Sequence, residues 1–239
     1  MDQANLKKRI QQGETVIGVG VPGSISPDDF RAALDERHYD FVFTDGQHSA
    51  LSEDRLVAFC QMADEFDIPV RFRIKHTREA YLVGNYLDLG PAGIEVPQVE
   101  QVETVDEAVE SFYYPPLGRR SFGGRARKSV DQYADPLEYA QWWNDYGMLW
   151  IQVESVAAVT HSYSLARPGV DCIAFGPTDL TVDLHHNPHP QLKSLDDCVA
   201  YVARSLEGTG TGICLRTRAD LQQKYADLGI TVFLLSPGS

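Results

Sequence analysis

The sequence lacks the features by which exported and membrane-spanning proteins are recognised. It contains no apolar run of about 18 residues and no apolar stretch like that of a signal peptide near the N-terminus. Only four cysteines occur, far apart inside apolar segments and without CxxC spacing. Buried, reduced thiols are therefore expected rather than a disulfide framework. Together these absences predict a soluble cytoplasmic protein that does not contact a membrane.

Positive charge is also scarce. Lysine and arginine number 21 against 34 aspartates and glutamates, which gives a formal net charge of -13 and a pI near 4.9. Because nucleic-acid binding requires a basic surface, a nucleic-acid partner is not expected. Small anionic substrates stay compatible with the sequence, since the segment 118–128, GRRSFGGRARK, concentrates basic residues. Apolar residues make up 43% of the chain, which is enough for a sizeable core and argues against global disorder.

What is present is an alternation of short apolar runs with amphipathic stretches. The apolar runs are mostly continuous, as in parallel strands that helices cover on both faces. Strands are predicted at residues 15–21, 40–45, 68–74, 92–97, 148–154, 171–177, 210–216 and 231–236. The helices predicted between them include 26–37 with Ser26 as its N-cap, 52–66 opened by Ser52, 77–89, 104–112 and 136–146. Eight βα units in a chain of 239 residues indicate an α/β fold, the (β/α)8 TIM barrel.

The predicted barrel occupies the whole chain. No repeat of fixed period and no low-complexity linker divides the sequence, so a single domain over residues 1–239 is expected. The eighth strand ends three residues before the last residue, which leaves the C-terminal helix short or absent. Another segment or a partner subunit is then expected to cover the last strand.

Polar residues at the C-terminal ends of the strands are the candidates for a site, because barrel active sites are built there. Asp45 ends the second strand, and His48 lies in the turn that follows it. Arg71 and Arg73 are two residues apart on the third strand, so both point to the same side. The fourth, fifth and sixth strands run into Glu95, Gln98, Glu154 and Asp179.

This set of residues suits metal-assisted chemistry on a 2-oxo acid. Glu154 and Asp179, on neighbouring strands, are typical ligands of a hard divalent cation that water helps to hold; magnesium or manganese is expected, and carboxylates discriminate poorly against cobalt. Such a cation would stabilise an enolate as a Lewis acid. His48, held by Asp45, would be the general base, and Arg73 would stabilise the developing oxyanion. Each residue also has a simpler interpretation when it is considered alone. Asp45 fits a turn cap, His48 fits a structural histidine, and Glu154 or one of the two arginines fits an ion pair.

Six segments carry a further signal: FVFTDGQH, PVRFR, GIEVPQVE, YYPPLGRRSFGG, LWIQVES and IAFGPTDL. In this order they resemble the signature segments of the HpcH/HpaI aldolases, class II pyruvate aldolases of the phosphoenolpyruvate/pyruvate barrel superfamily, to which macrophomate synthase is related. The resemblance implies a metal-dependent carbon–carbon lyase that reversibly cleaves a 4-hydroxy-2-oxo acid to pyruvate and an aldehyde through a metal-bound enolate. It also implies a homo-oligomer.

Position by position, the resemblance implies Glu154 and Asp179 as metal ligands, His48 with Asp45 as the acid–base pair, and Arg73 as the partner of the keto oxygen. It implies that the substrate is bound by Gln152, Gly176, Pro177, Thr178 and Arg120.

The sequence departs from the family pattern at two places. Gln47 stands where the family usually has a glutamate; the amide keeps hydrogen bonds but cannot take a proton. In addition, the family usually continues past the eighth strand into a helix that packs on a neighbouring subunit, and this sequence stops at Ser239.

Two other patterns in the sequence suggest different functions. GVGVPG at 18–23 has the outline of a dinucleotide fingerprint, but Pro22 and the Ser26 cap start the helix too late for it. DLHHNPHP at 183–190 holds three histidines and is predicted to be an ordinary loop. The functional alternatives are oxaloacetate decarboxylation, a macrophomate-synthase-like reaction, a lyase of CoA thioesters, and a barrel that binds a 2-oxo acid without turning it over.

Overall fold

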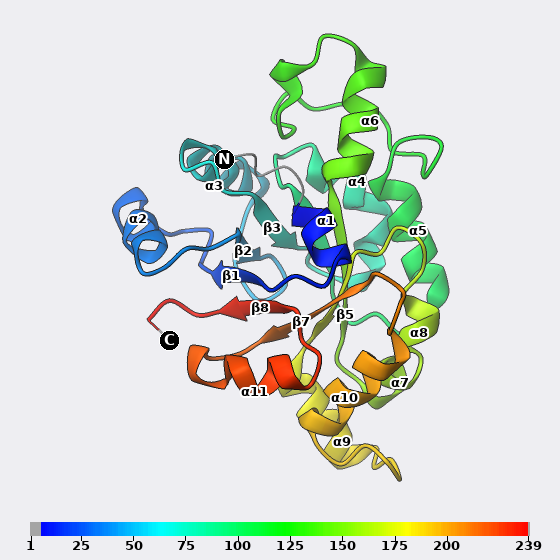
Figure 1. Cartoon of the computed structure of the whole chain (residues 1–239). Helices are drawn as coiled ribbons and strands as arrows, with labels where there is room; N and C mark the ends of the chain where they lie inside the picture. The colour runs from blue at the N-terminus through cyan, green and yellow to red at the C-terminus, as the bar shows by residue number, and fades with distance from the viewer. Residues whose placement is uncertain (1–5, 239) are drawn as a thin grey trace.

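Eight parallel strands close into a barrel, and helices surround it (Figure 1). The computed structural model describes residues 6–238. Each strand pairs with the next one in sequence, and β1 also pairs with β8 in a register that places Val19 beside Leu235. The strands are β1 (Val16–Gly20), β2 (Phe41–Asp45), β3 (Val70–Arg73), β4 (Gly93–Val96), β5 (Met148–Val153), β6 (Cys172–Phe175), β7 (Gly212–Arg216) and β8 (Val232–Leu235). The predicted TIM barrel is confirmed.

The helical elements alternate with the strands. Ser26 and Ser52 cap the two helices predicted for them, since their hydroxyl oxygens accept the backbone N–H groups of Asp29 and Arg55. No helix within residues 6–238 is long and apolar enough to cross a bilayer. In chain order the elements are α1 (Leu6–Gln11), α2 (Pro27–Asp35), α3 (Glu53–Glu65), η1 (Thr77–Leu82), α4 (Val83–Leu87), α5 (Val102–Phe112), η2 (Val130–Gln132), α6 (Pro136–Tyr146), α7 (Val156–Thr160), α8 (Ser162–Leu165), α9 (Pro177–His186), α10 (Leu195–Ser205), η3 (Ala219–Leu221) and α11 (Gln222–Asp227).

One predicted loop is wrong. Residues 183–190 begin inside α9, whose last turn contains His185 and His186. Pro177 at the first helical position, an acid in the first turn and histidines in the last turn all favour this helix. It ends before Pro188, which disfavours helical backbone in the preceding residue.

The single helix predicted over 77–89 is two shorter elements in the structure. It is a 3-10 helix, η1, followed by the short α4. Gly84, which lowers helix propensity, lies at the junction. A Cβ at this position would lie 2.9 Å from the carbonyl oxygen of Ser111, so the glycine allows close packing on α5.

The last strand is covered by the chain itself. Phe233 and Leu235, on the outward face of β8, are 0% and 2% exposed. In Figure 1, α2 and α11 lie on either side of this strand. A partner subunit is therefore not needed to bury it.

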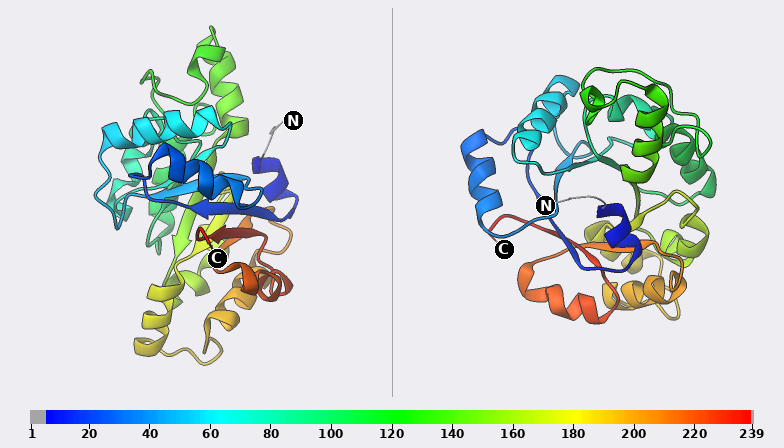
Figure 2. Two further views of the ribbon diagram at one scale, coloured as in Figure 1. Left: turned by 90° about the vertical axis from the view of Figure 1, so that its left-hand side faces the viewer. Right: turned by 45° about the horizontal axis from the view of Figure 1, so that its top comes forward.

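The N-terminal end of the barrel is closed by α1. Figure 2 (right) shows this helix over the ring of strands. Its residues Leu6 and Ile10 belong to the same buried cluster as Phe41 and Trp150 of the barrel interior. A Cβ at Gly212 would lie 2.5 Å from a methyl carbon of Ile10, so β7 and α1 are in direct contact.

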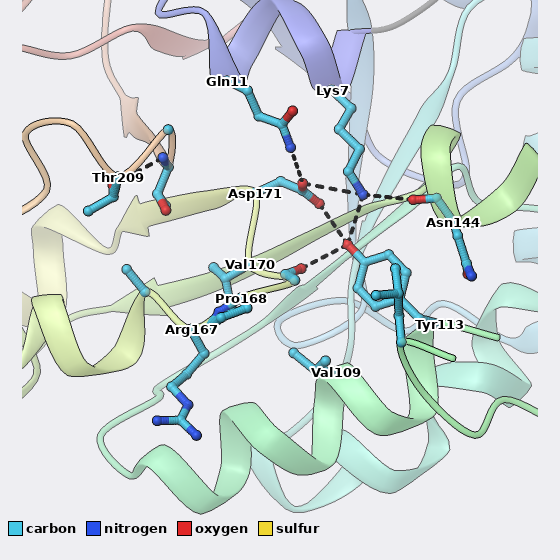
Figure 3. Close-up of a pocket in the computed structure, with 15 residues that line it drawn as sticks. Lys7, Gln11, Val109, Tyr113, Asn144, Arg167, Pro168, Val170, Asp171 and Thr209 are labelled. Atoms are coloured by element: carbon cyan, nitrogen blue, oxygen red, sulfur yellow. Dashed lines mark hydrogen bonds and ion pairs between the residues drawn. The ribbon is translucent and has the colours of Figure 1, made fainter. Parts of the chain in front are cut away.

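A polar network fixes α1 to the barrel (Figure 3). The Lys7 ammonium lies 3.4 Å from Oδ1 of Asp171, which is 2% exposed, and donates to the Tyr113 hydroxyl at 3.0 Å. Asp171 also accepts the backbone N–H of Leu149 at 2.9 Å. Lys7, Tyr113 and Asp171 line a cavity of about 670 Å³, and because the charges of Lys7 and Asp171 are already paired with each other, the network is structural.

Replacing Lys7 with methionine is expected to lower the free energy of unfolding by about 3 kcal/mol, since it leaves the buried Asp171 without its cation. Urea unfolding followed by circular dichroism measures this change. Lys193→Met, at an exposed lysine, is the control and should change stability by less than about 0.5 kcal/mol. Equal losses in the two variants would show that the network does not stabilise the fold.

Candidate active site

The structure brings Asp45, Arg73 and Gln152 together at the C-terminal mouth of the barrel. Nε and Nη2 of Arg73 donate to the two carboxylate oxygens of Asp45 at 2.7 and 2.8 Å. Nη1 of the same guanidinium donates to Oε1 of Gln152 at 3.1 Å. Arg73 is 8% exposed, so these bonds hold its charge in one orientation next to the mouth.

The expected pairing of Asp45 with the His48 ring is corrected by the structure. Besides Arg73, the Asp45 carboxylate accepts the backbone N–H groups of Gln47 at 2.9 Å and His48 at 3.2 Å. Burial opposes ionisation of Asp45, but the Arg73 hydrogen bonds and charge prevail, so the pKa of Asp45 is lowered. The carboxylate is thus occupied by its neighbours, and the His48 side chain is exposed beside the mouth.

Glu154 directly follows β5 and is buried at 8% exposure. Its Oε1 atom has no hydrogen-bond partner among the described residues. Burial and then the charge of Asp179 raise the pKa of Glu154 to about 7, although Arg73 and a hydrogen bond with Gln98 act in the opposite direction. A buried oxygen without a partner, facing a second carboxylate, is a place where a cation would lower the electrostatic free energy.

Glu154 and Asp179 therefore fit a divalent cation. Both supply the hard oxygen ligands that such ions prefer, and Asp179 is exposed in the first turn of α9. Within residues 6–238, no group of three or more histidine, cysteine, aspartate or glutamate side chains is placed to hold a metal. Two protein ligands would leave the other coordination positions to water and substrate oxygens, as is common for magnesium.

Gly176 allows the close approach of Glu154 to α9. A Cβ at position 176 would lie 2.2 Å from Oε2 of Glu154 and 2.9 Å from Nε2 of Gln152. Gly176 is also the N-cap of α9, followed by Pro177 and Thr178. The first backbone N–H groups of a helix are unpaired within it, and at this end of the barrel they suit a substrate carboxylate.

Arg120 lies outside this group. Its guanidinium donates to Oδ1 of Asp88 at 2.9 Å and packs over the Tyr114 and Trp143 rings at 5.0 and 4.6 Å. Asp88 follows α4, which precedes β4, so the pair is near the opposite end of the strands from Glu154. In this chain Arg120 connects helices outside the barrel, and the substrate role assigned to it is not supported.

Arg216 is a residue of the mouth that the sequence did not predict, and Glu95 had no predicted role. Nη2 of Arg216 donates to Oε1 of Glu95 at 2.6 Å, so the pair joins β7 to β4 across the barrel. Glu95 is 0% exposed and pairs in register with Arg73. The position of Arg216 as the last residue of β7 is the signal that could have found it, since the same rule selected the other candidates.

Two cavities open near these residues. One of about 270 Å³ is lined by Glu154, Asp179 and His186 among others, and so lies directly beside the two carboxylates. The other, of about 460 Å³, is lined by Arg216, Phe43 and Leu234 among others on the side of β7 and β8.

Comparisons with a family model, with known sequences and with solved structures all match this chain to aldolases. A family model described as HpcH/HpaI aldolase/citrate lyase matches residues 29–227. A hydroxypyruvate/pyruvate aldolase from Roseobacter denitrificans is 31% identical over 201 residues, which cover 79% of this chain and 73% of that protein. One from Delftia acidovorans is 28% identical over 80% of this chain and 71% of its own length. The crystal structure of an HpcH/HpaI aldolase from Desulfitobacterium hafniense is 29% identical, with a TM-score of 0.84 over 97% of this chain and 89% of that one.

Proposed function

This chain belongs to the HpcH/HpaI aldolase/citrate lyase family, and on that premise we propose that it is a divalent-metal-dependent pyruvate aldolase. It would cleave a 4-hydroxy-2-oxo acid to pyruvate and an aldehyde, and catalyse the reverse addition. The observation that carries the proposal is the buried, unpartnered oxygen of Glu154 facing Asp179 beside the fixed guanidinium of Arg73. The names of the aldolase relatives agree with it.

Glu154 and Asp179 are the residues that would hold the cation, with magnesium and manganese as the best fit and cobalt also compatible. When bound, the ion would supply Lewis-acid polarisation of the 2-oxo group. The substrate carboxylate would accept the backbone N–H of Thr178 in the first turn of α9. Gly176 and Pro177 would shape the binding site rather than donate to it, because the Gly176 N–H already donates to the carbonyl oxygen of Val153 at 3.0 Å and proline has no N–H.

Arg73 would face the keto oxygen and stabilise the negative charge that develops on it during carbon–carbon cleavage. Asp45 and Gln152 keep the guanidinium in place through three hydrogen bonds, so little reorganisation is needed when the charge appears. Asp45 is thus a positioning residue, and it also orders the turn before His48 through two backbone hydrogen bonds.

His48 would move the proton. In the cleavage direction its imidazole takes the proton of the 4-hydroxyl group, the C3–C4 bond breaks, and the bond electrons form the enolate of pyruvate as the aldehyde leaves. A proton then returns to C3 to give the methyl group. Gln47 cannot take part in proton transfer because an amide has no titratable proton at neutral pH, which leaves His48 as the base in this turn.

The first test avoids the unknown aldehyde. In deuterated water with Mn²⁺, the protein is expected to exchange the methyl protons of pyruvate, which proton NMR follows directly. Chelation with EDTA should stop the exchange, and His48→Ala should slow it by roughly 100-fold while Mn²⁺ binding is kept. If a folded sample that binds Mn²⁺ shows no exchange, the aldolase proposal fails, and a barrel that binds 2-oxo acids without turnover becomes the better account.

The affinity for Mn²⁺ is expected to rise with pH up to about 7 and then to level off. Glu154 must lose its proton to bind a cation, and its pKa is raised to about 7 by burial and by Asp179. The gain should be roughly tenfold between about pH 6 and about pH 8. Calorimetric titration in buffers of different ionisation enthalpy measures both the affinity and the proton released. A flat affinity over this range would contradict the assignment of Glu154 as a ligand.

A further inference from the structure

We propose that Gln98 is a positioning residue for Glu154. The turn that follows β4, residues 97–99, directs the side-chain amide of Gln98 to the Glu154 carboxylate and so keeps this carboxylate in the orientation that binds the cation. The inference rests on the proposed cation site and adds a role for Gln98 to it.

The backbone of Gln98 has a conformation that L-residues rarely adopt. Its φ is +51°, in the left-handed region, where the Cβ atom comes too close to the following carbonyl oxygen. Glycine, asparagine and aspartate commonly occupy this region, and glutamine does not. Within residues 6–238, the other non-glycine residues with positive φ are Asp67 and Ser129, and neither lines the cavity beside Glu154. A glutamine in this conformation at the mouth of the barrel points to a role for its side chain.

Hydrogen bonds on both sides of Gln98 hold the turn in this conformation. The Thr77 hydroxyl donates to the carbonyl oxygen of Pro97 at 2.9 Å, and the backbone N–H of Val99 donates to the carbonyl oxygen of Gln152 at 2.9 Å. Both Pro97 and Val99 are buried, so the turn cannot relax without breaking these contacts. Because Gln152 belongs to β5, the turn is fixed to the strand that precedes the carboxylate ligand.

The side chain of Gln98 reaches this ligand. It forms a hydrogen bond with the Glu154 carboxylate, although it is exposed to solvent, and both residues line the cavity of about 270 Å³ beside Asp179. Oε1 of Glu154 has no partner among the described residues, so the amide holds one carboxylate oxygen and leaves the other available. A carboxylate that binds a cation is ionised and only accepts hydrogen bonds, so the amide N–H is the donor. Because the amide is neutral, it orients the carboxylate without neutralising the charge that attracts the cation.

Gln98→Gly is expected to weaken Mn²⁺ binding about tenfold. The amide donor is lost, but glycine accepts the positive φ, so the turn is kept. The unfolding temperature of the metal-free protein should change by less than about 2 °C, since the release of strain offsets the greater freedom of glycine in the unfolded chain. Calorimetric titration without substrate measures the affinity, thermal unfolding in EDTA measures the stability, and the EPR spectrum of bound Mn²⁺ should change with the ligand geometry. A merely structural residue would change the unfolding temperature but not the affinity or the spectrum.

Asp67→Gly is the matched control. Asp67 has the same φ of +51° and is exposed, but it lies between α3 and β3, near the opposite end of the strands from Glu154. Its substitution should leave the Mn²⁺ affinity and the EPR spectrum unchanged. Gln98→Asn is a second variant that keeps an amide and tolerates this φ, yet its side chain is one methylene shorter. It should weaken Mn²⁺ binding about as much as Gln98→Gly.

The possible failures of this inference and of the proposed function are distinguishable. Native Mn²⁺ affinity in both Gln98 variants, or an equal loss in Asp67→Gly, would overturn the role of Gln98 even if the native protein exchanges the methyl protons of pyruvate. If the native protein binds no Mn²⁺, the proposed cation site fails, and the role of Gln98 fails with it. Because the affinity is measured without substrate, absence of turnover alone would overturn only the aldolase function.

Discussion

Replacing Glu154 with alanine is expected to slow Mn²⁺-dependent exchange of the pyruvate methyl protons by at least about 1,000-fold. The variant removes one of the two carboxylates that fit the cation, and Asp179 alone is an exposed side chain in the first turn of α9. Stability should not suffer, because a buried carboxylate oxygen without a partner is removed at the same time. NMR exchange rates, Mn²⁺ titration and thermal unfolding of the same sample measure the three quantities.

Glu103→Gln is the control for this experiment. Glu103 is exposed in the first turn of α5, so its substitution changes the net charge without touching the barrel mouth. Exchange and Mn²⁺ affinity should both stay close to those of the native protein. If Glu154→Ala binds Mn²⁺ as tightly as the native protein, the cation is held elsewhere, and the assignment of Glu154 as a ligand is wrong.

The second large effect is expected from a single added methyl group. Gly176→Ala would place a Cβ 2.2 Å from Oε2 and 2.8 Å from Cβ of Glu154, far inside van der Waals contact. Backbone strain is not the cause, because φ at Gly176 is -96° and any residue tolerates it. Glu154 must move, so exchange should fall by roughly 100-fold or more, together with some loss of stability from overpacking.

A matched glycine makes this result interpretable. A Cβ at Gly20, at the end of β1, would have its nearest neighbour at 3.7 Å, which is ordinary contact. Gly20→Ala should therefore leave the exchange of pyruvate protons near the native rate. If Gly176→Ala is as active as Gly20→Ala, Glu154 has an alternative position that supports the reaction, and its observed placement is not the catalytic one.

The strands were predictable because their signal is local. A parallel strand covered on both faces is a continuous apolar run, and runs such as Met148–Val153 are buried throughout. The N-caps at Ser26 and Ser52 were predictable for the same reason. A serine followed by acidic residues at the start of an amphipathic stretch marks the beginning of a helix, and this pattern spans only a few residues. The fold class follows from the count and order of these elements.

The partners of the charged side chains could not be predicted in the same way. Asp45 is three residues from His48 in sequence, yet its carboxylate pairs with Arg73 on the next strand. Arg216 and Glu95 are 121 residues apart and meet only because the barrel closes. The partner of each charged side chain depends on the closed barrel, because barrel closure decides which hydrogen-bond donors come within about 3 Å of an acceptor. The sequence predicted which charged residues lie at the C-terminal mouth of the barrel, but not which of them form ion pairs with one another.

The network around Lys7 and Asp171 bears on how this protein could be redesigned. The contacts that join α1 to the barrel lie at the opposite end of the strands from Glu154 and the cavity beside Arg216. Substitutions in the cavity wall, at Leu221 or Thr217 for instance, therefore act on few of the contacts that keep the barrel closed. A library that varies these positions should retain a high fraction of folded members, which makes the mouth of the barrel a favourable place to select for altered substrate specificity.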